Sequence, residues 1–243
     1  MRSRWGSWGW ESVKKKVHCA LNCCLNVWEL VGMVRSGLAS QQILLGVVAG
    51  VSIFSAGYVG AGLSLLLVLV PVGAGGALLD RNRKVYMAFT LMILLSGIAL
   101  VLIRDDMGGG WMLWLAFVVV ITDVVGYFAG RAFGGPKFWP AISPKKTWSG
   151  TAAGWVGAAI VGAVFSINTD AGMSLVWISI LVAMASQLGD IAESALKRKM
   201  GVKDSSNLIP GHGGLMDRFD GMLGASVFVL FVIQVIGFPA GLG

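Results

Sequence analysis

Three aspartates in the last quarter of the chain stand at spacings that place carboxylates on a common helical face. Asp217 and Asp220 are three residues apart, which puts both near one helix N-terminus and on one side of it. Asp190 shares a second face with Glu193, Ser194 and Lys197, at offsets of 3, 4 and 7. Acids that converge without a neutralising cation repel one another, and hard carboxylate oxygens favour magnesium. The sequence therefore predicts that Asp190, Asp217 and Asp220 bind magnesium.

The segment between these acids also carries many cations and a glycine-rich turn. Basic side chains suit the oxygens of a polyphosphate, and the backbone amides of the turn from Gly211 to Gly214 can approach an anion. His212 alone is ambiguous, because a neutral hydrogen-bonded imidazole is commoner than a catalytic one. Together with the metal site, this composition predicts chemistry on a nucleotide phosphate. The basic residues are Lys197, Arg198, Lys199, Lys203 and Arg218.

A second basic segment, residues 130 to 150, reads GRAFGGPKFWPAISPKKTWSG. Trp139 and Trp148 would suffice to anchor a basic loop at a membrane interface. The run from Ser143 to Thr147 equally offers hydroxyls and cations for a lipid phosphate. Both interpretations stay open on this loop alone. Asp123, about two helical turns before Arg131, is either a metal ligand or the partner of a basic residue.

The remainder of the chain must position these groups, and its composition is that of a membrane protein. Of 243 residues, 56% are apolar and 13% charged, and the mean hydropathy is +0.78. A soluble domain carries roughly 25% charged residues. The long apolar runs also exclude a disordered chain and a disulfide scaffold. Because no strand-like alternation is visible, we expect an all-α, polytopic helical bundle.

Seven charge-poor segments are long enough to cross a bilayer. Two lie within residues 36–79, broken near residues 57–62, and the others cover about 85–103, 111–130, 147–169, 171–189 and 221–243. The expected organisation is a basic N-terminal segment (1–35), four spans (36–130), a basic loop (131–150), two spans (151–193), the charged motif (194–220) and a last span (221–243).

Seven spans would place 18 of the 19 Lys and Arg residues on one side, with Arg104 alone opposite. Such a bias marks the cytoplasmic side, and it explains the net charge of +7 without a nucleic-acid partner. The first 35 residues are less readable, because Asn22, Asn26 and Glu29 interrupt their apolar part. We favour an amphipathic segment on the interface over an eighth span, which would move five basic residues to the far side. The three cysteines, all in this segment, indicate neither a disulfide nor a metal site.

The charged motif closely resembles the diagnostic motif of the CDP-diacylglycerol synthases, also called phosphatidate cytidylyltransferases. Residues near Asp123 to Arg131 and the block SPKKTWSG look like other recurrent segments of that family. The first 35 residues do not resemble the hydrophobic helix with which the family usually begins. The matching positions are Ser194, Leu196, Lys197, Arg198, Lys203, Asp204, Ser206, Ile209, Pro210, the run His212 to Leu215, and the run Asp217 to Asp220.

The resemblance implies that phosphatidic acid and CTP react to give CDP-diacylglycerol and pyrophosphate. It also implies a homodimer in the bacterial cytoplasmic membrane, with the active site on the cytoplasmic side. Asp190, Asp217 and Asp220 would bind one or two magnesium ions and, with Lys197, form the catalytic set. Lys197, Arg198, Lys203 and Arg218 would hold the triphosphate, and His212, Gly213 and Gly214 the nucleotide. Arg131, Ser143, Lys145, Lys146 and Thr147 would bind the lipid phosphate, and Ser194 and Asp204 complete the substrate-binding set.

Two classes of alternative remain. Another CTP-dependent membrane enzyme, a polyprenol kinase or a cytidylyltransferase for ether lipids, would share the acids and basic loops. A secondary transporter would instead use Asp123 and Asp190 for coupling ions, and it predicts internal symmetry that the sequence does not show.

Overall fold

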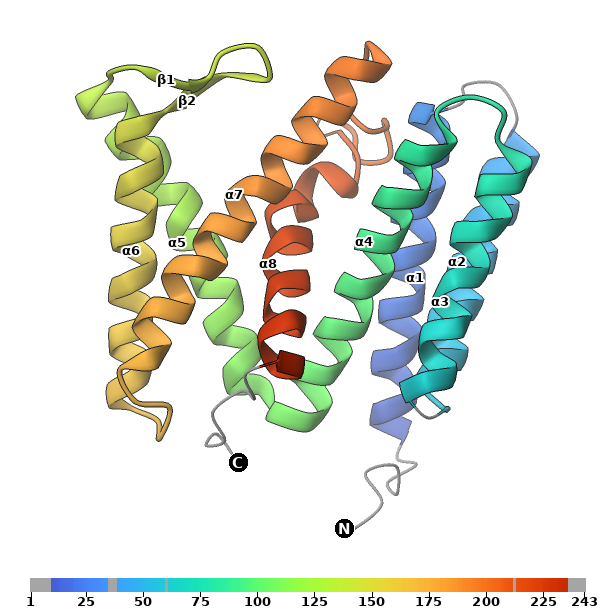
Figure 1. Cartoon of the computed structure of the whole chain (residues 1–243), viewed down its shortest axis with the longest axis horizontal. Helices are drawn as coiled ribbons and strands as arrows, with labels where there is room; N and C mark the ends of the chain where they lie inside the picture. Colours follow the sequence, from blue (N-terminus) through green and yellow to red (C-terminus); the bar gives the residue numbers. More distant parts are fainter. Residues whose placement is uncertain (1–9, 35–38, 60, 212, 236–243) are drawn as a thin grey trace. The chain divides into compact units, whose positions relative to one another are not determined.

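A computed structural model describes residues 10–34, 39–59, 61–211 and 213–235, and this part of the chain is mainly helical (Figure 1). The all-α class is confirmed. Its α-helices are α1 (Trp10–Val34), α2 (Ala39–Ala56), α3 (Ala61–Leu78), α4 (Arg83–Leu102), α5 (Gly109–Phe133), α6 (Trp148–Ile167), α7 (Ser174–Met200) and α8 (Met216–Val235), with a π-helical turn (Ile103–Met107) between α4 and α5.

The chain divides into two compact units. Unit 1 comprises Met1–Val101 and Val202–Asp217, and unit 2 comprises Leu102–Gly201 and Arg218–Gly243. In unit 1, α1 packs against α2, and α2 packs against α3. In unit 2, α6 packs against both α5 and α7. The loop before α8 belongs to unit 1, whereas nearly all of α8 belongs to unit 2.

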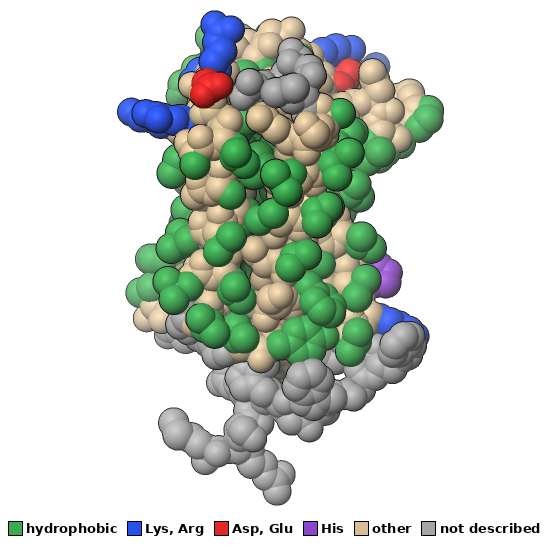
Figure 2. Space-filling view, turned by 90° about the vertical axis from the view of Figure 1, so that its right-hand side faces the viewer, with side chains coloured by type: hydrophobic (Ala, Val, Ile, Leu, Met, Phe, Trp, Pro, Cys, Tyr) green, Lys and Arg blue, Asp and Glu red, His purple; other side chains and the backbone are tan. Residues whose placement is uncertain are grey.

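The helices have the length and composition of membrane spans. Seven stretches of the described chain are apolar enough and at least 18 residues long, and α3 adds a shorter apolar stretch, Leu63–Leu78. Large apolar side chains point outward along them, including Leu66 of α3 and Ile160 of α6, each 60% exposed. Figure 2 shows such side chains covering the middle of one face, with charged side chains toward its ends. This surface suits lipid chains, and the protein is a multi-pass membrane protein.

The N-terminal segment differs from the expectation of an interfacial helix. Its Val13–Val34 stretch is long and apolar enough to span, and Val27 and Leu30 of α1 are fully buried. The interruption at Asn26 and Glu29 is also buried, with exposed fractions of 0% and 1%. A helix that lies on a membrane surface keeps its polar face in water. The structure therefore favours the eighth span, and 13 of the 19 basic residues, rather than 18, then share one side.

The structure adds detail to two predicted segments, the sixth span and the basic loop. The helix of the sixth predicted span continues through the start of the charged motif, because α7 runs to Met200 and ends at Gly201, whose φ of 70° is left-handed. The basic loop is not wholly irregular. It forms an antiparallel hairpin of β1 (Lys137–Trp139) and β2 (Ser143–Thr147), which gives its backbone groups partners where no helix can form across Pro140 and Pro144.

Glycines let the helices of unit 2 approach closely. Gly150 of α6 faces the backbone of Gly126 in α5, and a Cβ at Gly126 would lie 3.1 Å from the Gly150 carbonyl. Gly189 of α7 faces α8, where a Cβ would meet the Asp220 carbonyl at 2.5 Å. Small residues of this kind allow helix backbones to pack tightly in a membrane. Gly189 directly precedes Asp190, so this contact holds the backbone of α8 close to α7 beside Asp190.

Candidate active site

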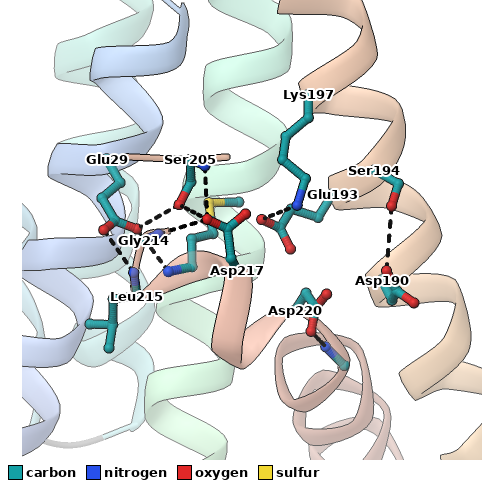
Figure 3. A network of polar contacts seen from close by, with 12 residues as sticks. Glu29, Asp190, Glu193, Ser194, Lys197, Ser205, Gly214, Leu215, Asp217 and Asp220 are labelled. Carbon is teal, nitrogen blue, oxygen red and sulfur yellow. Dashed lines mark hydrogen bonds and ion pairs between the residues drawn. The ribbon is translucent and has the colours of Figure 1, made fainter. Parts of the chain in front are cut away.

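Asp190 lies on α7 between a cation and a hydroxyl. Its Oδ2 forms an ion pair with Lys146 Nζ at the end of the hairpin, and its Oδ1 accepts a hydrogen bond of 3.4 Å from Ser194 Oγ one turn further along α7 (Figure 3). The two side chains of the ion pair are 24% and 30% exposed. The structure thus joins the hairpin to α7 through two residues that the sequence assigned to different ligands, the lipid phosphate and the metal.

Three carboxylates of unit 2 lie close enough to interact electrostatically. Asp220 of α8 is repelled by the negative charges of Asp190 and of Asp123 on α5. Asp123 is attracted by the positive charge of Lys146. Asp123 itself is exposed, although it lies within a spanning helix. A carboxylate at such a position requires water, a cation or a polar ligand. The three helices therefore form an anionic centre, and Lys146 of the hairpin places a positive charge beside it.

Lys197 is held by an acid that the sequence analysis had placed on its face of α7. Its Nζ lies 3.2 Å from Glu193 Oε1, and the Glu193 side chain is 1% exposed (Figure 3). Glu193 also interacts with Asp220. The amide of Gly221 donates to Asp220 Oδ1 at 2.7 Å. Glu193 thus connects the cation on α7 with the carboxylate on α8.

The hairpin is fixed to α6 by hydroxyl groups. Thr147 is the N-cap of α6, where its Oγ1 accepts from the Gly150 amide at 3.2 Å. Its side chain is buried, and Ser149 Oγ donates to the same oxygen at 3.1 Å. Thr147 therefore begins the helix and thereby sets the position of its neighbour Lys146. A hydroxyl residue followed by an apolar helix was a signal for this cap in the sequence.

In unit 1, Asp217 organises the loop before α8. A single oxygen, Oδ2, accepts from the Ser205 amide at 2.8 Å, from Ser205 Oγ at 2.9 Å and from the Gly214 amide at 2.7 Å (Figure 3). Gly213, with a φ of 83°, also adjoins this oxygen. The Gly214 amide, which the sequence predicted could approach an anion, is thus directed at Asp217.

Glu29 of α1 holds the same loop, a role that was not predicted from the sequence. Oε1 accepts from Leu215 N at 2.8 Å and from Ser206 Oγ at 2.7 Å. Oε2 accepts from Met216 N at 2.7 Å and from Ser205 Oγ at 3.1 Å. An acid within an apolar helix was the available signal, but it was interpreted as an obstacle to spanning.

The remaining predicted binding residues are mostly exposed. Arg131 lies in the last turn of α5, where its Nη1 donates to Tyr127 Oη at 3.4 Å. Ser143 begins β2 and is half-buried. His212 lies outside the described residues, so its predicted role remains a prediction. Exposed members of the set are Lys145, Arg198, Lys203, Asp204 and Arg218.

The predicted metal ligands are divided between the units, with Asp217 in unit 1 and Asp190 and Asp220 in unit 2. Within the described chain, no group of three or more His, Cys, Asp or Glu side chains is arranged to hold a metal ion. The donor chemistry of Asp123, Asp190 and Asp220 nevertheless fits magnesium, because all three supply carboxylate oxygens.

Comparison with known families supports the interpretation of the charged motif. A sequence model of the Cytidylyltransferase family matches residues 16–236, which include every described helix except the start of α1. The chain belongs to the cytidylyltransferase family. The match begins within α1, so this helix and its Glu29 are part of the cytidylyltransferase region.

Several curated relatives carry the name phosphatidate cytidylyltransferase. The protein from Brucella abortus is 43% identical over 149 residues, which are 59% of this chain and 55% of the relative. The Staphylococcus saprophyticus protein is 40% identical over 167 residues (65% and 62%), and the Mycobacterium bovis protein is 36% identical over 165 residues (67% and 53%). The chain thus spans between 53% and 62% of the length of these three relatives.

Proposed function

We propose that this membrane protein transfers the cytidylyl group of CTP to phosphatidic acid, with CDP-diacylglycerol and pyrophosphate as products. The observation that carries the proposal is the electrostatic interaction of Asp123, Asp190 and Asp220, all on membrane-spanning helices, with one another and with Lys146 of the hairpin. Both substrates are phosphate esters, and one of them is a lipid. A charged centre on lipid-exposed helices suits this pair, and the family and the names of the relatives support it.

In the proposed reaction, a phosphate oxygen of phosphatidic acid attacks the α-phosphorus of CTP. The new P–O bond forms as the bond to the β-phosphate breaks, and pyrophosphate leaves with that electron pair. Little covalent work falls to the protein, so positioning and charge stabilisation dominate. Arg131, Ser143, Lys145 and Lys146 bind the lipid phosphate in this proposal, and Lys197, Arg198 and Arg218 bind the triphosphate.

Magnesium is part of the proposal, held in unit 2 by Asp190 and Asp220 with Asp123 beside them. When bound, the metal supplies positive charge to the phosphate oxygens. Lys146 forms an ion pair with Asp190. Glu193 keeps the Lys197 ammonium within 3.2 Å, so this cation is directed before any ligand arrives.

The test uses the purified full chain in lipid micelles with CTP labelled in its α-phosphate, phosphatidic acid and magnesium. Labelled CDP-diacylglycerol and an equal amount of pyrophosphate are expected, and ATP should not replace CTP. A polyprenol kinase would instead transfer the γ-phosphate and release CDP. A transporter would give no product, and a preference for an ether-linked lipid phosphate would indicate the related ether-lipid enzyme. Absence of pyrophosphate release contradicts the proposal.

Asp190→Asn and Asp220→Asn should each reduce turnover at least a hundredfold, because each removes a charge from the anionic centre. The variants should still insert into membranes and elute as the wild type does in size-exclusion chromatography. Near-normal turnover in either variant would remove that residue from the metal site.

The proposal includes a homodimer in the bacterial cytoplasmic membrane with the site facing the cytoplasm. The bacterial relatives support this location. Light scattering of the detergent-purified protein, corrected for bound detergent, measures the number of chains, and a single chain would contradict the dimer.

A further inference from the structure

We infer that Glu29 of α1 is a positioning residue for the proposed reaction, because its carboxylate fixes the loop that leads into α8, whose first turn contains Asp217. The inference rests on the proposed function. Glu29 is 1% exposed, and its partners lie 176 to 187 residues away in the sequence. A buried charge in a spanning helix is costly unless it is paired or hydrogen-bonded. The groups that donate hydrogen bonds to Glu29 therefore indicate its role.

Each oxygen of Glu29 accepts one backbone N–H and one hydroxyl. The two amides, Leu215 N and Met216 N, can only donate, so both oxygens of Glu29 act as acceptors. Met216 is the first residue of α8. A negative charge is favoured at that end of a helix, where the first amides lack partners within the helix. Glu29 therefore accepts, from α1, the first backbone amides at the N-terminus of α8.

The hydroxyl of Ser205 connects Glu29 with Asp217. Its Oγ lies 3.1 Å from Glu29 Oε2 and 2.9 Å from Asp217 Oδ2. A hydroxyl has one proton and can donate to only one of the two carboxylates at a time. The Ser205 amide remains on Asp217 in either case, at 2.8 Å. The loop is thus held between two fixed acids.

The loop packs closely against Glu29 at Gly214. A Cβ on Gly214 would lie 2.7 Å from both Glu29 oxygens and would also collide with Ser205 Oγ. Hydrogen bonds to an ionised group are stronger and shorter than those between neutral groups. Since Asp217 lies within this network and Asp220 follows three residues later in α8, displacement of the loop displaces a predicted metal ligand. Glu29 contacts neither substrate in this account.

The variant Glu29→Gln tests the inference in the full chain. It preserves the size of the side chain but replaces one acceptor oxygen with a donating NH₂ group, which faces either Leu215 N–H or Met216 N–H. We expect kcat to fall at least tenfold, whereas KM for CTP and for phosphatidic acid should change less than threefold. Glu29→Asp retains the charge but retracts it by one methylene, so its kcat should fall between those of the wild type and Glu29→Gln.

Asn26→Leu is the matched control. Asn26 lies one turn earlier on α1 and is fully buried, but its amide donates only within the helix, to Asn22 O and Oδ1 at 2.8 and 2.9 Å. Its turnover per folded molecule should remain within twofold of the wild type, even if its thermal stability changes.

Hydrogen–deuterium exchange provides a readout that does not depend on the reaction. Peptides covering residues 205–217 should exchange at least tenfold faster in Glu29→Gln than in the wild type, and peptides from α3 should not change. Unchanged exchange in the loop overturns the inference, as does faster exchange with turnover within twofold of the wild type. An inactive wild type instead removes the proposed function, and exchange alone then decides whether Glu29 holds the loop.

A second variant keeps the inference testable if Glu29→Gln does not fold. Ser206→Ala removes only the 2.7 Å donor to Oε1 and leaves both backbone hydrogen bonds. A twofold to fivefold loss of kcat with faster loop exchange supports the inference. Wild-type values for both measurements overturn it.

Discussion

Asp217 combines two roles that a pair of substitutions can separate. Its Oδ2 accepts three hydrogen bonds from the loop, whereas the sequence assigned its charge to magnesium. In Asp217→Asn, the amide oxygen can still accept those bonds, so the thermal unfolding temperature should remain within a few degrees of the wild type. In Asp217→Ala the donors lose their partner, and the protein should unfold at a distinctly lower temperature. Hydrogen bonds to a charged group contribute about 1.5–3 kcal/mol each.

The turnover of Asp217→Asn then tests whether the reaction requires the negative charge of Asp217. If Asp217 binds the metal, Asp217→Asn should lose at least a hundredfold in kcat despite its retained stability. An active and stable Asn variant would restrict Asp217 to holding the loop.

Lys146 and a magnesium ion would compete for Asp190. Lys146→Gln removes the ammonium from Asp190 Oδ2, so the magnesium concentration for half-maximal turnover should decrease severalfold. The same change should lower kcat/KM for phosphatidic acid about tenfold, because a phosphate-binding cation is lost. Lys145→Gln is the control, since Lys145 is exposed and adjacent. It should weaken the use of phosphatidic acid without altering the magnesium dependence. An unchanged or higher magnesium requirement in Lys146→Gln would contradict the competition.

At the scale of elements, the helices of unit 2 depend on glycine for their spacing. A Cβ at Gly162 of α6 would lie 2.6 Å from Ser179 Oγ and 2.9 Å from the Leu175 carbonyl of α7. Gly162→Ala should therefore destabilise the protein by about 1–3 kcal/mol, the usual cost of overpacking. The measurement is unfolding of the purified protein in detergent.

Gly73→Ala is the matched substitution in α3, where a Cβ would meet nothing within 4 Å. It should be neutral or stabilise by up to about 1 kcal/mol, because alanine favours a helix more than glycine does. Equal effects of the two substitutions would show that close packing at Gly162 contributes nothing to stability.

At the scale of the whole molecule, the path of the chain across the membrane depends on α1. With α1 and α3 both counted as spans, five helices separate Lys14 from Lys137, and α6 separates Lys137 from Thr169. Lys14→Cys and Thr169→Cys should therefore react with an impermeant thiol reagent on one side of the membrane, and Lys137→Cys on the other.

The measurement uses sealed vesicles of known orientation, with labelling of the wild type subtracted. Cys19, Cys23 and Cys24 all lie within α1, so little background labelling is expected. Labelling of Lys14→Cys on the same side as Lys137→Cys would restore the interfacial position of the N-terminal segment.

The sequence by itself determined what depends on neighbours along the chain. Long apolar runs predicted the helices, since backbone groups in lipid must be satisfied within each segment. The offsets of Glu193 and Lys197 predicted a shared face, and the two form an i,i+4 ion pair. The run from Ser194 to Asp220 predicted the family, which the comparison confirmed.

Only the tertiary structure decided which distant groups meet. From the sequence alone, Glu29 is a charged residue in an apolar segment with no partner nearby in the chain. The loop that donates hydrogen bonds to it lies more than 170 residues away. Asp190 likewise acquires Lys146 as its partner through the packing of the hairpin beside α7. Burial makes an acid costly without donors, and those donors come from segments that only folding brings together. Spacing along the chain therefore predicted which acids belong to the candidate site. Packing determined which acids form hydrogen bonds or ion pairs with other segments of the protein.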